Sequence, residues 1–194
     1  MTNYDAQTAL IVVDVQNDFA DPKGSLFVKE GEQVVGVANR EVERALEAGA
    51  MVVYTTDWHP ETTPHFKKDG GIWPVHCVHD TWGAEFHPQL QVKGEIVRTG
   101  VGGEDGYSGF SVRDPVSGER GATALEAILR TQTITRLVIL GLATDYCVKE
   151  TALDGARLGF ETLVLLEGCR AVNLQPGDGE RAIEDMKLAG VRLE

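Results

Sequence analysis

Apolar and polar positions follow two different patterns along the chain. Short runs rich in Val, Ile and Leu have the length and composition of buried strands, and the stretches between them repeat apolar residues at helical spacing. The strands predicted in this way are Ala9–Val13, Met51–Thr55, Ile96–Val97, Leu137–Leu140, Thr162–Leu166 and Val191–Leu193, and the helices are Glu32–Ala48, Ala122–Arg130, Thr144–Leu158 and Gly179–Leu188. Such alternation favours an α/β fold of three layers, in which helices cover both faces of a mostly parallel sheet of about six strands.

The composition is that of an ordinary globular protein, with 42% hydrophobic residues among 194, and one domain over residues 1–194 is expected. The net charge of -12 argues against a nucleic-acid partner, because phosphate binding requires a clustered basic face. The N-terminus lacks the pattern of a secretion signal, and no apolar run approaches the ~20 residues that span a membrane. We therefore expect a cytoplasmic protein without a membrane partner, and its three cysteines fit a reducing compartment.

Cys147 follows the predicted strand Leu137–Leu140, at a turn that should lead into the next helix. Functional residues of open α/β sheets lie at the carboxyl ends of the strands, so this position suits a nucleophile. In the first turn of a helix, free N–H groups and the helix dipole would lower the pKa of the thiol. The alternative is that Cys147 is a small buried core residue, which is the role expected for Cys77 and Cys169.

Asp14 emerges directly from the first predicted strand, at the same edge of the sheet. A carboxylate in a half-buried cleft has a raised pKa and can accept the proton of a thiol, which makes Asp14 a candidate general base. By itself, Asp14 is better explained as the cap of a loop or helix. Its pairing with Cys147 favours the catalytic interpretation.

A cluster of metal-ligating residue types follows the second predicted strand. Asp57, His59 and His65 fall close together, and His76 comes soon after. Carboxylate and neutral imidazole groups are ordinary ligands of divalent transition metals, so we expect one bound ion, either zinc, iron or manganese. Two ligands separated by one residue, as Asp57 and His59 are, are expected to need a turn between them. Isolated histidines are more often surface or core residues, but the clustering favours a metal site.

Four segments together carry a resemblance to a known family. They are Asp14–Phe19, the cluster of Asp57, His59, His65 and His76, the segment Tyr107–Phe110, and Gly141–Val148. In this combination the chain resembles the nicotinamidases and pyrazinamidases of the isochorismatase-like hydrolase family over nearly its whole length. The first and last segments indicate the superfamily, and the metal cluster indicates the nicotinamidase branch.

The resemblance implies an amide hydrolase. Cys147 would attack the carboxamide carbon of nicotinamide, ammonia would leave, and water would hydrolyse the resulting thioester, with Asp14 moving the protons. An oxyanion hole would form around a cis peptide bond at Leu142–Ala143 together with the amide of Cys147. The metal cluster would hold a divalent ion that binds the ring nitrogen of the substrate and orients it.

The resemblance also assigns a binding pocket for a small pyridine carboxamide. Phe19, Trp73 and Tyr107 would surround the flat ring, beside the turn at Leu142 and Ala143. Ordinary core packing is the alternative for the aromatic residues. Relatives are monomers, dimers or larger rings, so a homo-oligomer is compatible with the sequence, which does not select among these states.

One position departs from the family pattern. Relatives carry a lysine after the third strand, where this chain reads Arg-Thr-Gly, so Thr99 occupies the place of the third catalytic residue. Without that cation, the thiol of Cys147 and the carboxyl group of Asp14 should ionise less readily, and activity should fall. Arg98 should point to the opposite face of the strand and Lys149 away from the site, so neither is expected to replace the lysine.

Three functions remain open after this departure. The first is a nicotinamidase that Thr99 impairs, and the second is a protein that binds metal and a pyridine carboxamide without chemistry. The third is a hydrolase of another small amide. The glycine-rich, acidic segment Val101–Gly106 is expected to be a mobile loop beside the site.

Overall fold

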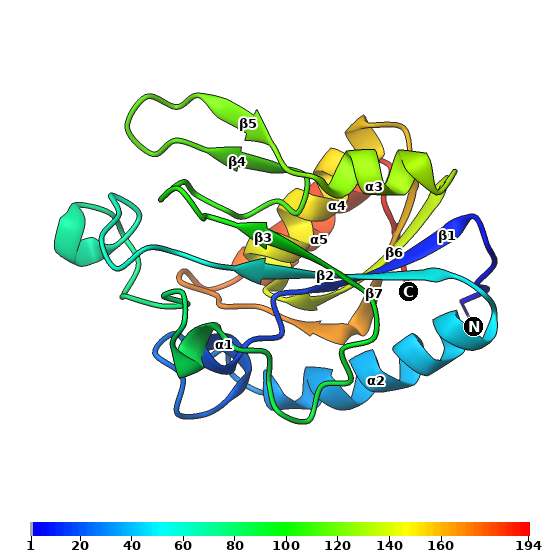
Figure 1. The fold of residues 1–194 in the computed structure, drawn as a ribbon, viewed down its shortest axis with the longest axis horizontal. Helices are drawn as coiled ribbons and strands as arrows, with labels where there is room; N and C mark the ends of the chain where they lie inside the picture. The colour runs from blue at the N-terminus through cyan, green and yellow to red at the C-terminus, as the bar shows by residue number, and fades with distance from the viewer. Residues whose placement is uncertain (1) are drawn as a thin grey trace.

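The computed structural model describes residues 2–194 and contains a parallel sheet between two layers of helices (Figure 1). Neighbouring strands of this sheet are all parallel, and their order is β3-β2-β1-β6-β7-β8. The expected α/β fold is therefore confirmed. The strands are β1 (Thr8–Val13), β2 (Met51–Asp57), β3 (Glu95–Thr99), β6 (Arg136–Leu142), β7 (Glu161–Arg170) and β8 (Arg192–Leu193).

Helices cover both faces of the sheet (Figure 1). The long helix α2 (Glu32–Glu47) lies along one face, against β1, β2, β6 and β7. Most of its apolar residues recur at helical spacing and are buried, as the sequence pattern predicts. The remaining helices are α1 (Asn17–Ala20), which follows β1, and α3 (Leu125–Thr131), α4 (Lys149–Arg157) and α5 (Asp178–Leu188) on the other face; two 3-10 turns, η1 (Lys67–Asp69) and η2 (Trp82–Ala84), lie in the connection from β2 to β3.

Strand β1 lies at the centre of the sheet, and all of its residues are buried. Its sequence is an unbroken apolar run because a parallel strand covered on both faces has no side exposed to water. Burying a large aliphatic side chain contributes about 1.5–3 kcal/mol, so this strand and its neighbours form the stable centre of the molecule. The ends of β1, β2 and β6 are thereby fixed relative to one another.

The parallel register brings the carboxyl ends of four strands to one edge. Val13 of β1 lies beside Thr55 of β2 and Gly141 of β6, and Asp57 of β2 lies beside Thr99 of β3. The residues that follow these strands therefore leave the sheet next to one another. This is the edge at which open α/β sheets place functional groups.

Two predicted helices differ from the structure. The helix expected from Ala122 begins at Leu125, because Arg120–Ala122 forms strand β5, antiparallel to β4 (Ser111–Arg113). The helix expected over Thr144–Leu158 is divided. Thr144–Val148 forms a π-helical turn, and α4 begins only after it, so Cys147 lies in that turn and not in the first turn of an α-helix.

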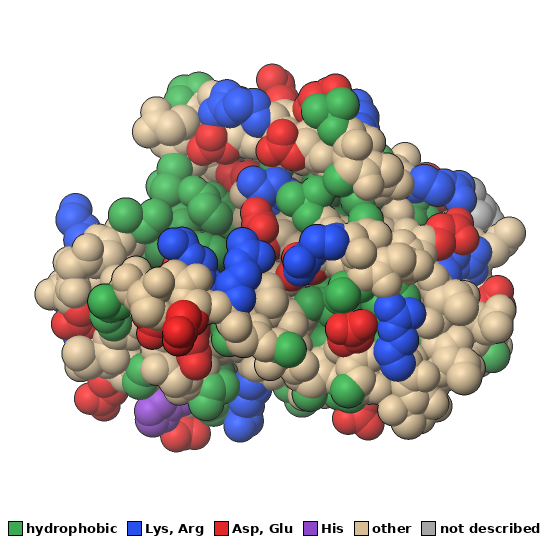
Figure 2. Space-filling view, turned by 90° about the horizontal axis from the view of Figure 1, so that it is seen from above, with side chains coloured by type: hydrophobic (Ala, Val, Ile, Leu, Met, Phe, Trp, Pro, Cys, Tyr) green, Lys and Arg blue, Asp and Glu red, His purple; other side chains and the backbone are tan. Residues whose placement is uncertain are grey.

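The outer surface carries charges of both signs. Figure 2 shows the face above α3 and the β4–β5 hairpin, where Lys and Arg side chains lie among Asp and Glu. In the part of the chain that the structure describes, no helix combines the length and the apolar character needed to cross a membrane.

Candidate active site and metal centre

Asp14 and Cys147 lie next to each other at the carboxyl edge of the sheet. Asp14 follows β1 with a φ of 50°, which turns it out of the strand direction, and it is 1% exposed. Thr55 Oγ1 donates a hydrogen bond of 2.6 Å to Asp14 Oδ1. The thiol of Cys147 and one oxygen from each of the Asp14 and Asp57 carboxyl groups lie within 4.8 Å of one another. The structure thus brings together the residues predicted as nucleophile and base.

The surroundings of this pair disfavour negative charge. Burial and, after it, the Asp57 carboxylate raise the pKa of Asp14 to about 8, against the hydrogen bond from Thr55. Burial and the nearby Asp14 and Asp57 raise the pKa of Cys147 well above its usual value. The raised pKa expected for Asp14 is confirmed. The lowered thiol pKa expected from a helix start is wrong, because burial and two carboxyl groups outweigh the N–H groups of the π-helical turn.

Thr99 lies at the end of β3 and is 1% exposed. Its hydroxyl group donates a hydrogen bond of 3.1 Å to Asp57 Oδ1, and Thr56 O is a second acceptor at 3.3 Å. A hydroxyl group contributes no positive charge to Asp14 and Cys147. The side chain in the place of the family lysine therefore bonds to a predicted metal ligand.

Two nearby cations are engaged elsewhere, as the sequence predicts. The guanidinium carbon of Arg98 lies 4.1 Å from the centre of the Trp58 ring. Lys149 Nζ lies 3.6 Å from Glu150 Oε1. Within residues 2–194, the side chains that line the pocket beside Cys147 include no Lys or Arg. The nucleophile therefore lacks a cationic neighbour in this pocket.

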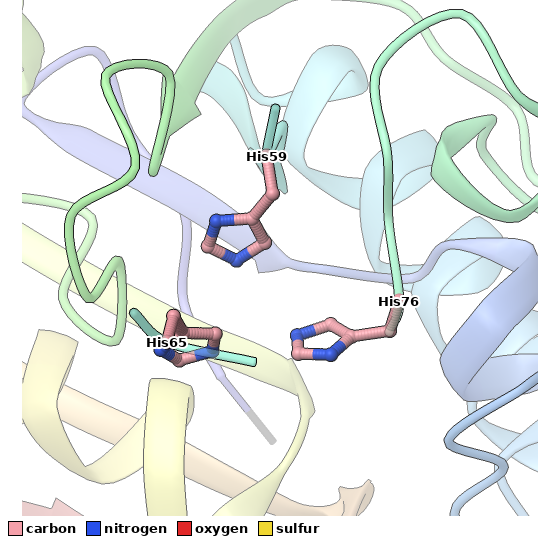
Figure 3. Close-up of side chains that lie close together, drawn as sticks. All are labelled: His59, His65 and His76. Carbon is pink, nitrogen blue, oxygen red and sulfur yellow. The ribbon is translucent and has the colours of Figure 1, made fainter. Parts of the chain in front are cut away.

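Three imidazole rings from different segments converge on one point (Figure 3). One ring nitrogen each from His59, His65 and His76 lies within 4.8 Å of the other two. Asp57 Oδ2 lies 3.6 Å from both His59 Nε2 and His76 Nε2. The outward nitrogens have acceptors, since His65 Nδ1 lies 2.6 Å from Asp105 Oδ1 and His76 Nδ1 lies 2.8 Å from a backbone carbonyl oxygen. All four residues predicted as metal ligands are therefore adjacent.

His59 provides a test of whether these residues fit a metal ion. The side chain is fully buried, and neither of its ring nitrogens has a hydrogen-bond partner among the described residues. An unpartnered buried polar group costs about 1–3 kcal/mol, so this ring requires a ligand. Three imidazole groups and one carboxylate fit a divalent transition metal such as zinc, iron or manganese.

The protonation states of the cluster also suit a metal ion. Burial is the main cause that lowers the pKa of His65 below its usual value, against the hydrogen bond to Asp105. Burial opposes the ionisation of Asp57, but His59 and His76 hold its pKa below the usual range. A neutral imidazole and an ionised carboxylate are the forms that bind metal, so the shifts at His65 and Asp57 each favour the metal-binding form.

No turn separates Asp57 from His59, contrary to the expectation from sequence. The chain stays extended beyond β2, since Trp58 N donates to Thr99 O at 2.9 Å and His59 N donates to Cys77 O at 2.9 Å. In an extended chain, residues i and i+2 point to the same side. Because side chains alternate between the two sides of an extended chain, the Asp57 and His59 side chains both point into the metal cluster without a turn.

One pocket is lined both by members of the metal cluster and by Cys147, the predicted nucleophile. Trp73 Nε1 donates a hydrogen bond of 2.7 Å to Tyr107 Oη, and the Trp73 and Tyr146 rings meet edge to face at 4.8 Å. The Leu142–Ala143 peptide bond is cis, as the resemblance implies. All five residues predicted for the substrate pocket line it. The lining residues are Phe19, Leu26, Val28, Asp57, His65, Trp73, His76, Tyr107, Leu142, Ala143, Tyr146, Cys147 and Val172.

Sequence reasoning missed residues that hold the site from outside. The Gln16 side chain bonds Asp57 twice, donating to Asp57 O at 2.8 Å and accepting from Asp57 N at 2.8 Å. Gln16 belongs to the Asp14–Phe19 segment that carried the family resemblance, and this membership could have indicated a role in the site. Tyr146 is next to Cys147 in sequence and lines the pocket. Asp105 contacts His65, and the only sequence feature that could have indicated this contact is the acidic character of its loop.

Comparison with known proteins gives consistent matches over almost the whole chain. The family model of the isochorismatase domain matches residues 8–193. The nicotinamidase of Escherichia coli (strain K12) is 39% identical over 204 residues, which cover 95% of this chain and 93% of that protein. The pyrazinamidase of Pyrococcus horikoshii in complex with zinc has a TM-score of 0.85 at 40% identity, covering 97% and 98% of the two chains. A protein from L. infantum in complex with nicotinate has a TM-score of 0.88 at 32% identity, covering 100% and 95%.

Proposed function

The chain belongs to the isochorismatase family, and we propose that it is a nicotinamidase, which hydrolyses nicotinamide to nicotinic acid and ammonia. The observation that carries this proposal is the arrangement of one pocket, which has the Asp57 and histidine cluster at one end and Cys147 at the other. The similarity to nicotinamidases over nearly the full length supports it. We place the reaction in the cytoplasm, as a step in NAD salvage, because a thiol nucleophile requires reducing conditions.

The proposed chemistry is carried by Cys147 and Asp14. Asp14 accepts the thiol proton as Sγ bonds to the carboxamide carbon, and it then gives a proton to the departing nitrogen, which leaves as ammonia. Water attacks the thioester and Asp14 accepts its proton; Asp14 then returns this proton to Sγ as the Sγ–carbon bond breaks, which releases nicotinic acid and regenerates the thiol. The backbone N–H groups at Leu142–Ala143 and Cys147 stabilise the oxyanion in both steps.

At the other end of the pocket, Asp57, His59, His65 and His76 would hold one divalent ion. When bound, this ion supplies a Lewis acid for the ring nitrogen and so fixes the orientation of the carboxamide relative to Cys147. Zinc is our first choice, because the similar pyrazinamidase of Pyrococcus horikoshii is in complex with zinc. Phe19, Trp73 and Tyr107 enclose the flat ring and exclude water from it.

We further propose that Thr99 reduces turnover. The pKa values of Asp14 and Cys147 are both raised, and no cation lines the pocket among the described residues to oppose that shift. At neutral pH, the base is then mostly protonated and the thiolate is scarce. The same observation favours a second candidate, a protein that binds metal and a pyridine carboxamide without catalysing hydrolysis.

The test is release of ammonia from nicotinamide by the zinc-loaded protein, measured beside its Thr99→Lys and Cys147→Ala variants. Slow release that rises about 10²–10⁴-fold with lysine and vanishes with alanine is expected, since that is the typical contribution of a positioned acid–base group. No release from either the parent or Thr99→Lys, with zinc and nicotinamide bound, would favour the binding protein. Hydrolysis of a different small amide without any bound metal would favour the third interpretation from the sequence.

A further inference from the structure

We propose that Asp105 is a positioning residue for the metal centre, and that Thr99–Asp105 forms a layer of outer contacts around the metal ligands. This inference rests on the metal site of the proposed function. Its central contact is between Asp105 Oδ1 and His65 Nδ1, at 2.6 Å. An imidazole that donates its Nδ1 proton to a carboxylate presents the lone pair of Nε2, so the contact fixes both the tautomer and the direction of the ring.

The backbone of Asp105 is itself fixed. Asp105 N donates to Arg113 O at 2.8 Å, and Arg113 N donates to Asp105 O at 3.0 Å, so the residue pairs with strand β4. Its side chain is only 13% exposed. Because the carboxylate starts from a paired backbone and is shielded from water, it can restrict the His65 ring rather than follow it.

A second connection ties the same loop to the segment that carries His65. Thr63 Oγ1 donates to Gly103 O at 2.5 Å and accepts a hydrogen bond from His65 N at 3.1 Å. The backbone and the ring of His65 are therefore both connected to the glycine-rich loop. Two side-chain hydrogen bonds, Thr63 to Gly103 and His65 to Asp105, therefore hold the glycine-rich loop beside the metal centre in this structure.

The start of the segment contacts two further ligands. Thr99 Oγ1 donates to Asp57 Oδ1 at 3.1 Å. Gly100 has a φ of 70°, and a Cβ atom at this position would lie 2.4 Å from the His59 ring, so only glycine allows the backbone to lie against that ring. Thr99–Asp105 therefore touches three of the four proposed ligands, while the fourth, His76, bonds to the carbonyl oxygen of Pro74.

These contacts have a predictable consequence for metal affinity. Removing an outer partner of a histidine ligand typically weakens metal binding about 10–100-fold, because the ring loses its fixed direction and part of its basicity. The loss should be greatest for Asp105, since it combines a charge with a short hydrogen bond. We expect the effect on binding whether or not the protein turns over nicotinamide.

The closing experiment measures zinc affinity by competition with a chromophoric chelator. Asp105→Ala should weaken binding about 10–100-fold, and Asp105→Asn, which keeps an acceptor oxygen without the charge, should weaken it less. Glu104→Ala is the matched control, because it removes an adjacent carboxylate that bonds Gly102 N and touches no ligand. Its affinity should stay within about threefold of the parent, as expected for a surface charge.

A spectroscopic readout separates positioning from a general loss of structure. Each variant should bind Co(II). The visible absorption of the Co(II) form should change in position or intensity in Asp105→Ala, whereas that of Glu104→Ala should match the parent. Near-UV circular dichroism of the metal-free proteins checks that all variants fold. If Asp105→Ala does not fold, the near-isosteric Asp105→Asn is compared with the parent instead.

The outcomes distinguish this inference from the proposed function. Equal zinc affinities and Co(II) spectra for folded Asp105→Ala and the parent would overturn the role of Asp105, even if nicotinamide is hydrolysed. The expected loss of affinity would support it, even if no hydrolysis is observed. A parent protein that binds no divalent metal would overturn both the metal centre of the proposed function and this inference.

Discussion

At the metal end of the pocket, the ligands are surrounded by partners. Gln16 holds the backbone of Asp57, Asp105 bonds the ring of His65, and a backbone carbonyl oxygen bonds that of His76. At the nucleophile end, Asp14 receives one side-chain hydrogen bond, from Thr55, and the thiol of Cys147 lies against two carboxyl groups. Both ends lie on the same sheet edge, but only one is surrounded by groups that favour its working protonation states.

The difference shows that binding and chemistry can be separated within one pocket. A metal ion would balance the charge of Asp57 and complete the coordination of three histidines, whereas nothing among the lining residues balances the charge of Asp14 or of a thiolate. A protein built in this way can keep its affinity for metal and substrate while turnover changes widely. Each experiment below alters one end and measures both.

Cys147→Ala should have the largest effect on activity. Loss of the nucleophile should lower any nicotinamide hydrolysis by at least about 10⁴-fold, because no covalent intermediate can form. Zinc affinity should change by less than about tenfold, since the thiol is not one of the four proposed ligands, although it lies within 4.8 Å of an Asp57 oxygen. Ammonia release and chelator competition test both statements, and a large loss of zinc affinity would show that the two ends are not separable.

His59→Ala should produce the converse result. Loss of one of the four proposed ligands should weaken zinc binding by about 10²–10³-fold or more, because one of the bonds that hold the ion is removed. Alkylation of Cys147 by iodoacetamide in the metal-free protein should change less than about tenfold, because His59 affects the thiol only indirectly, through the pKa of Asp57. A tenfold change in the alkylation rate would show that the metal end and the nucleophile end of the pocket are not separable.

Thr99→Lys should change how Cys147 responds to pH. The pKa of Asp14 is raised to about 8 and that of the thiol well above its usual value, so in the parent both groups are mostly protonated at pH 7, and alkylation should rise only at a pH above the usual pKa of a thiol. A lysine beside them favours both ionised forms and should move the profile down by about one pH unit, which is about tenfold faster alkylation at pH 7.

Metal-free protein is required for this measurement, because a cation bound at Asp57 would itself lower both pKa values. Thr99→Met provides the matched control, since it has similar length without the charge. If methionine shifts the profile as far as lysine does, the cause is packing and not electrostatics. Cys147→Ala supplies the background from the buried thiols of Cys77 and Cys169.

Thr99→Val should have the smallest effect, and at the metal end alone. The substitution removes the hydroxyl group that bonds Asp57 Oδ1, and a net hydrogen-bond contribution of about 1 kcal/mol predicts that zinc binding weakens about 2–5-fold. Thr99→Ser, which keeps the hydroxyl group, should bind zinc as the parent does. Equal affinities for the valine and serine variants would show that Thr99 does not support the metal ligand.

Features that depend on a strong local pattern were predictable from sequence. Strand β1 and helix α2 follow from their hydrophobic periodicity, and the rule that parallel strands end at one edge was enough to place Asp14, Asp57 and Cys147 together. Strand β5 could not be predicted, because Arg120–Ala122 is fully exposed and has little intrinsic strand preference. It forms through pairing with β4.

The remaining misses concern geometry that local sequence does not carry. The π-helical turn at Thr144–Val148 adds residues to a turn without altering the apolar spacing that indicates a helix. Asp105 and His65 are forty residues apart in sequence, and their contact depends on how two loops fold against each other. The direction of the pKa shift at Cys147 could not be predicted either. A helix start lowers the pKa of a thiol, whereas burial beside carboxyl groups raises it.

The tryptophans give the protein its own optical reporter. Trp73 lines the pocket with its indole N–H bonded to Tyr107, whereas Trp58 lies under Arg98 and Trp82 is 45% exposed. An electron-poor pyridine ring placed against Trp73 quenches its emission, and Trp82 responds to solvent instead. A Trp82→Phe form would therefore let ligand entry be followed by fluorescence, independently of whether the ligand is turned over.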